Sequence, residues 1–308
     1  MQENRALGLK IHHSIGAPLA QYSNILLDTA LLPIAEMRMC WKEVCRRFDS
    51  DAILLKRFPQ ASQMAAILDE ENIDRESEEV SLVMELDTID SWTPFQASFS
   101  KSVRRGRRRR LQKIERELGD VKLEVHFGGT DAYRKAISLA LDFKRQWLKE
   151  SGRNISAFSG PDVAEFLMAL QGDSAARQGA MAYVMTAGGK PIAIELGFLQ
   201  QQHYYCFLGS FDWAHRNYSA GKVQMEQSLQ WAIENQISMI DYLGNYEAYQ
   251  GDWSNGTAAM ASYRAALSQK GRLYIGLWDR RLKPTAKAAF RRLPANIRKS
   301  LIAVLRDR

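Results

Sequence analysis

Cysteine is scarce in this sequence, and its positions point to neither a cross-link nor a metal. Among 308 residues only Cys40, Cys45 and Cys206 occur. An odd number without paired spacing argues against a disulfide framework, and neither these residues nor the five histidines show metal-ligand spacing. The sequence therefore predicts three small core residues in a reducing compartment, and no bound metal.

Long apolar runs are also lacking. The opening MQENRALGLK has no apolar core of a signal peptide. No uninterrupted apolar run approaches the roughly 18 to 20 residues that a membrane span needs. We therefore expect a cytoplasmic protein.

Positive charge is present but unevenly distributed. Residues 99–120 carry nine Lys/Arg against three Asp/Glu, and residues 272–308 carry eleven against two, so the rest of the chain is net acidic. Local basic segments favour phosphates, acidic polymers or an anionic membrane surface. Peripheral contact of the basic tail with an anionic membrane is therefore one expected partnership.

The densest basic stretch, RRGRRRR at 104–110, lies in a predicted amphipathic helix. Leu111, Ile114 and Leu118 recur at helical spacing, and Gly119 is a suitable C-cap. A nucleic-acid surface predicts interleaved aromatic residues or a recognised motif, and the run has neither. Two other interpretations are a solvated helix face joining two lobes, and an electropositive rim for a phosphate-bearing acceptor or donor.

Hydrophobic periodicity predicts a mixed α/β (α+β) chain. Three antiparallel strands over 179–212 form its clearest region, and a helix and a strand follow between 222 and 244. The other expected elements are strands at 52–58, 80–86, 122–127, 261–267 and 272–278, a helix from Thr130 to near Gly152, a helix from Pro161, a solvated loop at 69–79, and a tail whose helices are split at Pro284 and Pro294.

The order strand, two helices, antiparallel meander, loop, helix, strand resembles the GNAT acyltransferase fold. Three stretches also resemble the cellulose-biosynthesis (CelD-like) acetyltransferase family: FSKSVRRGRRRRLQKIERELG, FKRQWL, and YSAGKVQMEQSLQWAIENQISMIDYLGNYEAYQGDW. That family is similar to the Fem-type aminoacyltransferases, which pair two GNAT-like halves. The resemblance implies tandem lobes: an incomplete GNAT-like lobe at 1–97, a catalytic GNAT-like domain at 98–270 and a basic tail at 271–308.

The resemblance further implies acetyl-CoA or another acyl-CoA as co-substrate, and hence a pyrophosphate cradle. A helix N-terminus supplies one, because its first backbone amides have no partner within the helix and its dipole favours anions. The predicted cradle is Arg216, Ser219, Ala220, Gly221 and Lys222. The alternative is an ordinary capped helix.

Acyl transfer also needs a base and an acid. Glu195, among apolar residues of a strand, and Asp241, near the end of another, are the base candidates, and Tyr246 and Tyr249 are the acid candidates. For the two carboxylates the alternatives are a paired buried group and a turn-capping group. Where the family carries Tyr-Lys this chain has Tyr249-Gln250, which weakens any phosphate contact made by that lysine.

Three further residues, Arg145, Trp147 and Trp253, are expected to line the acceptor site, with core packing as the alternative for the tryptophans. The leading hypothesis is an acyl-CoA-dependent acyltransferase acting on a sugar or amine in exopolysaccharide or cell-envelope biosynthesis. The alternatives are a Fem-type transferase using aminoacyl-tRNA, for which the basic helix would bind nucleic acid, and a degenerate GNAT-like binding module.

Overall fold

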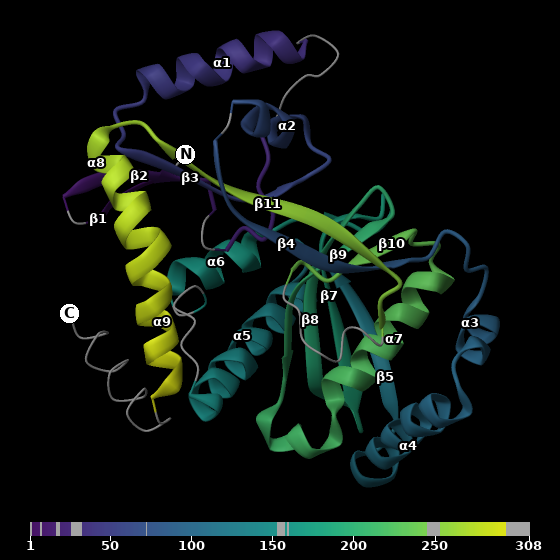
Figure 1. Cartoon of the computed structure of the whole chain (residues 1–308). Coiled ribbons are helices and arrows are strands. Elements are labelled where there is room, and N and C mark those ends of the chain that lie inside the picture. Colours follow the sequence, from purple (N-terminus) through teal and green to yellow (C-terminus); the bar gives the residue numbers. More distant parts are fainter. Residues whose placement is uncertain are drawn as a thin grey trace. The chain divides into compact units, whose positions relative to one another are not determined.

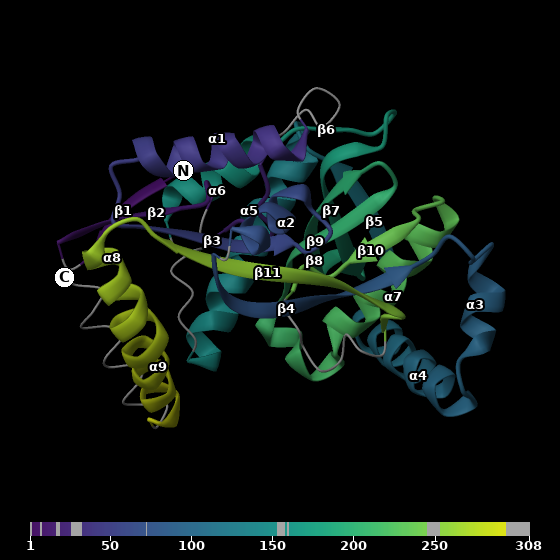
Figure 2. The same cartoon turned by 45° about the horizontal axis from the view of Figure 1, so that its top comes forward.

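The structure is a computed structural model of the chain (Figures 1 and 2). The residues described are 2–6, 8–16, 19–25, 33–71, 73–152, 158, 160–244 and 253–293. Contacts divide the chain into two compact units: unit 1 is Met1–Ser81 with Thr257–Arg308, and unit 2 is Leu82–Gly256. The predicted domain bounds stay a prediction, but the C-terminal segment groups here with the N-terminal one.

Unit 1 is built on a sheet that has helices on both faces. The strands follow the order β1 (Gln2–Ala6), β2 (Leu9–His13), β3 (Ala52–Pro59), β11 (Gly256–Ala266) and β4 (Asp74–Glu85), with β2 and β3 parallel. Alternating residues separate the two faces. One face, including Ile53 and Tyr263, packs against α1 (Ile34–Arg47) and α2 (Gln63–Glu70). The other, including Leu54, packs under the C-terminal helix.

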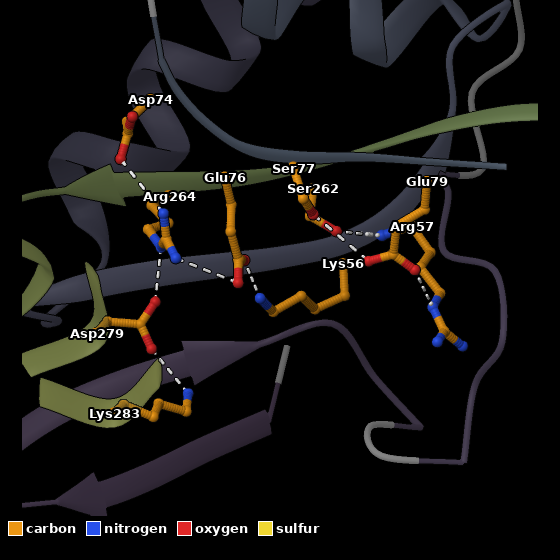
Figure 3. Close-up of polar contacts among 10 residues, drawn as sticks. All are labelled: Lys56, Arg57, Asp74, Glu76, Ser77, Glu79, Ser262, Arg264, Asp279 and Lys283. Atoms are coloured by element: carbon orange, nitrogen blue, oxygen red, sulfur yellow. Dashed lines mark hydrogen bonds and ion pairs between the residues drawn. The ribbon is translucent and has the colours of Figure 1, made fainter. Parts of the chain in front are cut away.

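The acidic stretch 69–79 was expected to be a solvated loop, and this prediction is wrong, because β4 begins at Asp74. Its charges are matched by cations of unit 1 (Figure 3). Glu76 contacts Lys56 and lies 3.2 Å from a guanidinium nitrogen of Arg264. Glu79 lies 3.1 Å from the Nε of Arg57. Ion pairs with neighbouring strands stabilise these acidic residues in a strand. Hydrophobic patterning does not register such pairs, so it indicates a loop here.

Residues 272–278 were expected to be a strand, and this prediction is also wrong. They lie in a continuous helix that comprises α8 (Gln269–Leu273), the π-helix η4 (Tyr274–Leu282) and α9 (Lys283–Arg292). Pro284 does not split this helix, because η4 runs to Leu282 and α9 continues from Lys283 through Pro284. Pro294 lies outside the described residues.

Unit 2 contains the predicted meander, which is confirmed. Its sheet runs from the end of β4 through β10 (Met239–Asp241), β9 (His203–Phe211), β8 (Lys190–Gln200) and β7 (Gln178–Ala187) to β5 (Val121–Phe127), and β6 (Gly172–Asp173) pairs with β7. Among the described residues of this unit the strand pairs are antiparallel except β9 with β10, which is parallel.

The helices of unit 2 flank these strands (Figure 1). They are α3 (Trp92–Ser98), α4 (Lys101–Leu118), α5 (Asp131–Ser151), α6 (Pro161–Ala169), the short 3₁₀ helix η2 (Trp213–Tyr218) and α7 (Ala220–Glu234). The predicted caps are confirmed. Thr130 accepts a bond of 3.2 Å from the amide of Tyr133 at the start of α5, and Gly119 and Gly152 end α4 and α5 with positive φ.

Candidate active site

The sheet of unit 2 opens where its two parallel strands separate. β10 pairs with β9 only at Met239–Asp241, opposite His203–Tyr205. β9 continues to Phe211, so its second half extends beyond the end of β10. In that half the carbonyl of Gly209 accepts a bond of 3.3 Å from the Nζ of Lys144, so a side chain of α5 contacts β9 where β10 no longer pairs with it.

Asp241 lies where the strands part, and its carboxylate holds the turn. Its Oδ1 accepts a bond of 2.8 Å from the amide of Leu243. Leu243 and Gly244 both have positive φ, which turns the chain out of the strand. The amide of Tyr242 donates to the carbonyl of Leu82 on β4, at 3.0 Å. The chain thus stays on β4 while it leaves β9, and the turn-capping interpretation of Asp241 has a direct structural basis.

The predicted cradle begins helix α7. Ser219 is the N-cap in a left-handed conformation, and its side chain makes no capping bond. Its carbonyl accepts from the amides of Lys222 and Val223, at 2.9 and 3.3 Å. The amides of Ala220 and Gly221 precede these, in the first turn, where no helical acceptor exists. A Cβ built on Gly221 meets no atom within 4 Å. This helix start is therefore not filled by protein side chains at Gly221.

Cationic side chains surround the segment that leads to this helix start. Arg216 lies over the ring of Trp213, 5.5 Å from its centre. Lys113 of α4 reaches the carbonyl of Asn217 at 3.4 Å and lies over the ring of Tyr218. The basic helix α4 thus packs beside η2, next to the start of α7. This neighbourhood suits an anion.

Glu195 is buried on β8 beneath α7. Its Oε1 accepts a bond from the hydroxyl of Tyr204 at 3.0 Å and from the thiol of Cys206 at 3.5 Å. Burial raises the pKa of the Glu195 carboxyl, and these two bonds only partly oppose that rise. Burial, followed by the nearby charge of Glu195, raises the pKa of the Cys206 thiol, and Asp241 adds to the effect. The two carboxylate candidates, Glu195 and Asp241, thus both raise the pKa of the same thiol.

Two buried polar groups near this region were not predicted. The hydroxyl of Tyr183 and the amide nitrogen of Gln224 are buried, and neither has a hydrogen-bond partner among the described residues. The Tyr183 ring contacts that of Tyr204, with centroids 5.1 Å apart. The burial of Gln224 could have been predicted from the sequence, because Gln224 and Ser228 lie at helical spacing with the apolar residues on the buried side of α7. Such groups need water or a ligand as partner.

The expected acceptor residues are not brought together. Arg145 is exposed on α5 and pairs with Asp142 at 3.0 Å, and Trp147 is half-buried on the same helix, where Lys144 lies over its ring. Trp253 is a core residue, and its carbonyl accepts the hydroxyl of Tyr242 at 2.9 Å. The packing alternative therefore describes Trp253 best.

Several predicted residues cannot be located. Tyr246 and Tyr249, with Gln250, lie outside the described residues. In the part of the chain that is described, no group of three His, Cys, Asp or Glu side chains is arranged to hold a metal. Nor does that part contain a helix with the length and apolar character to cross a membrane.

The arginines of α4 differ in exposure. Arg107 is buried and Arg110 is half-buried, whereas Arg104, Arg105, Arg108, Arg109 and Arg116 are exposed. The first four exposed arginines follow one another at steps of one, three and one, so they form a stripe along one side of the helix. We call these four residues the arginine stripe.

Comparisons with known proteins identify a similar family and similar folds. Residues 101–251 match the family described as acetyltransferase (GNAT) domain. No match was found among curated proteins. The structure of FemX superposes with a TM-score of 0.55 at 10% identity, covering 89% of this chain and 85% of that one.

Two further structures are similar. One is the C-terminal domain of a putative lysylphosphatidylglycerol synthetase from Agrobacterium fabrum, with a TM-score of 0.51 at 11% identity, covering 79% of this chain and 78% of that one. The other is a tandem GNAT protein from the clavulanic acid biosynthesis pathway, with a TM-score of 0.46 at 10% identity and coverage of 80% and 74%. The chain thus has a mixed α/β fold, and the sequence of residues 101–251 is similar to that of GNAT-type acetyltransferase domains.

Proposed function

We propose that this protein is an acyl-CoA-dependent N- or O-acyltransferase. The observation that carries the proposal is the start of α7, where Gly221 faces open space and the amides of Ala220 and Gly221 have no helical acceptor. GNAT domains typically use acyl-CoA as co-substrate. Arg216 and Lys222 would add positive charge for its phosphates.

In this proposal the chain's own residues move the protons. The acceptor's amine or hydroxyl attacks the thioester carbon, so a proton leaves the acceptor and another is needed by the departing thiolate. Glu195 is suited to accept the first, because a carboxyl with a raised pKa titrates closer to neutral pH. Tyr204, 3.0 Å from Glu195, would relay that proton. Asp241 is the second base candidate, and Tyr246 or Tyr249 would protonate the thiolate.

The proposed acceptor is a sugar or amine, and the proposed pathway is exopolysaccharide or cell-envelope biosynthesis. This part rests on the CelD-like resemblance of the sequence. Assays with radiolabelled acetyl-CoA and matched amino-sugar and neutral-sugar acceptors test it. Labelling of neither class would contradict it.

Binding of the donor is tested by calorimetry with acetyl-CoA and with longer acyl-CoAs. Gly221→Glu places a carboxylate at the cradle, and we expect at least tenfold weaker binding because of charge repulsion and lost space. Gly160→Glu is the matched control, because Gly160 also begins a helix and a Cβ built there also meets no atom within 4 Å. Equal affinity in both variants would remove the cradle assignment.

A second candidate is a Fem-type transfer from aminoacyl-tRNA, favoured by the arginine stripe on α4, the helix whose Lys113 contacts Asn217 and Tyr218 ahead of the cradle. It predicts that the purified protein carries nucleic acid, and that nuclease with high salt lowers its absorbance at 260 nm. Failure of every thioester to bind, with no nucleic acid present, would favour the degenerate binding module instead.

A further inference from the structure

The C-terminal helix of unit 1 contains an unusual segment. From α8 through η4 to α9 it runs without a break (Figure 1), and nine residues, Tyr274–Leu282, form a π-helix. In a π-helix each hydrogen bond spans five residues, so each turn takes about 4.4 residues and each residue rotates about 82°. Segments of this kind are rare and occur often at functional sites.

The buried side of this helix follows the π-helical period. Tyr274, Ile275, Asp279 and Lys283 fall within an arc of about 80° at that rotation, whereas the α-helical rotation would spread them over about 180°. Tyr274 and Ile275 pack on the sheet. Asp279 accepts bonds of 2.6 Å from Arg264 and 2.7 Å from Lys283 (Figure 3). This buried ion cluster fixes which side of the helix faces the sheet.

The same period gathers a second set of residues on the exposed surface. These are large apolar side chains with high exposure: Leu273 at 64%, Leu277 at 49%, Trp278 at 39% and Leu282 at 55%. They also share an arc of about 80°, whereas an α-helix would place the first and last on opposite sides. We call these four residues the apolar face.

Exposed arginines lie next to the apolar face on the surface of the helix. Arg272 and Arg281 are both exposed, and at π-helical rotation they lie within about 20° of each other. Arg280 also faces outward and pairs with Asp74. The sequence from 272 to 308 carries a net charge of +9. The helix therefore presents leucine, tryptophan and arginine next to one another on one exposed side.

We propose that the apolar face docks on an anionic phospholipid membrane. Helices that lie in the plane of a bilayer combine Trp and Leu on one face with Lys or Arg beside them, and the cations contact lipid phosphates. Solvent-exposed apolar clusters of this kind mark interaction sites. A second copy of the chain fits less well, because its +9 segment repels its equal. Nucleic acid would leave the exposed leucines without a partner.

Vesicle co-sedimentation of the full chain tests the proposal. The vesicles are phosphatidylcholine alone, and phosphatidylcholine mixed with phosphatidylglycerol. We expect binding to the mixed vesicles only. Leu277→Ser with Trp278→Ser should lower the partition coefficient at least tenfold through lost apolar contact. Arg272→Glu with Arg281→Glu should do the same, since each basic residue near the surface contributes about 1 kcal/mol, or about fivefold.

Matched controls separate this site from general charge and general hydrophobicity. Arg104→Glu with Arg108→Glu makes the same charge change on α4, and Phe166→Ser removes an exposed apolar residue of unit 2. Both should bind within about threefold of the unaltered protein. Trp278→Phe preserves the apolar face, and should bind normally while losing part of the fluorescence quenching by brominated lipid.

The outcomes are decisive in both directions. Absence of binding to the anionic vesicles would overturn the proposal, and so would equal loss of binding in the α4 control. Quenching that is unchanged in Trp278→Phe would place the contact elsewhere. A change of oligomeric state in the Leu277/Trp278 variant, with vesicle binding kept, would identify a second copy as the occupant and also overturn it. Acyl transfer to a soluble acceptor is measured separately and does not depend on this result.

Discussion

The guanidinium carbon of Arg107 lies 3.6 Å from the centre of the Trp253 ring and 4.0 Å from that of Phe99. Arg107 is 3% exposed, so this contact is part of the core of unit 2. One member of the most basic stretch of the sequence is therefore a packing residue, held between two aromatic rings. The same contact explains why Trp253 lies in the core.

Replacement of Arg107 tests this contact. Arg107→Ala should lower the free energy of unfolding by about 2 to 4 kcal/mol, since two desolvated cation–π contacts and packing are lost. Arg107→Lys should lose less. The exposed neighbour gives the control: Arg108→Ala should stay within about 0.5 kcal/mol. Urea unfolding monitored by tryptophan fluorescence measures all three, and equal effects at 107 and 108 would contradict the packing role.

The raised pKa of Glu195 predicts how the stability of the protein changes with pH. A carboxyl whose pKa is raised by folding holds a proton that the unfolded chain loses. Stability should therefore fall as pH rises above the unfolded value of about 4.3, by up to about 1.4 kcal/mol per pH unit, until the folded-state pKa is passed. Glu195→Gln should lack this slope and gain relative stability toward neutral pH.

The same variant separates the two roles of Glu195. A base that is replaced by an amide should lose about 10²- to 10⁴-fold in kcat, whereas a structural carboxyl should lose little. Glu124→Gln on β5 is the control for stability, because its side chain is half exposed. A wild-type pH slope that persists in Glu195→Gln would show that another group titrates.

Folding shifts the pKa of Asp279 in the opposite direction from that of Glu195. Burial alone would raise the pKa of this carboxyl, but the bonds from Lys283 and Arg264 outweigh burial and lower it. The stability that Asp279 contributes is therefore fully present above its pKa in the unfolded chain, about 3.9. It is lost as the pH falls through the lower pKa of the folded protein. Asp279→Asn should cost about 1.5 to 3 kcal/mol at pH 7, because Lys283 loses its carboxylate while Arg264 keeps Glu76 and Asp74.

Hydrogen exchange of the β11 amides at several pH values measures this loss within unit 1. The difference between Asp279→Asn and the unaltered protein should shrink in acid. Asp49→Asn is the control, because the Asp49 side chain is 86% exposed and should contribute under about 1 kcal/mol. A difference that does not change with pH would contradict the ionic origin of the effect.

Two glycines of the C-terminal helix should respond in opposite directions to alanine. A Cβ on Gly271 would overlap the carbonyl oxygen of Asp51, whereas one on Gly276 meets no atom within 4 Å. Gly271→Ala should destabilise by about 1 to 3 kcal/mol through overpacking. Gly276→Ala should be neutral or stabilise by up to about 1 kcal/mol, through helix propensity. Thermal melts compare them directly, and destabilisation of similar size in both would contradict the local explanation.

The elements with strong local signals could be predicted from the sequence. The meander, α4 with its Gly119 cap, and α5 between Thr130 and Gly152 carry period and capping information within the segment itself. The start of α7 was also predicted, because small residues before a helical pattern are a local signal.

The elements that were mispredicted depend on distant partners. The acidic strand β4 is stable because Lys56 of β3 and Arg264 of β11 pair with its Glu76. Residues 272–278 are not a strand because most of them lie in a π-helix, whose period places Tyr274, Ile275 and Asp279 on the buried side. In the site, the bond between Glu195 and Tyr204 joins neighbouring strands, but its partner could not be selected from the sequence alone.

The chain order of unit 1 has a consequence for its synthesis. β11 lies between β3 and β4 in that sheet, yet it is made after the whole of unit 2. On the ribosome, the sheet of the N-terminal segment therefore lacks an interior strand until residue 266 has emerged, whereas the last strand of unit 2, β10, ends at Asp241, 25 residues earlier. We infer that the segment made first is the one completed last, and that its exposed strand edges need protection for most of translation.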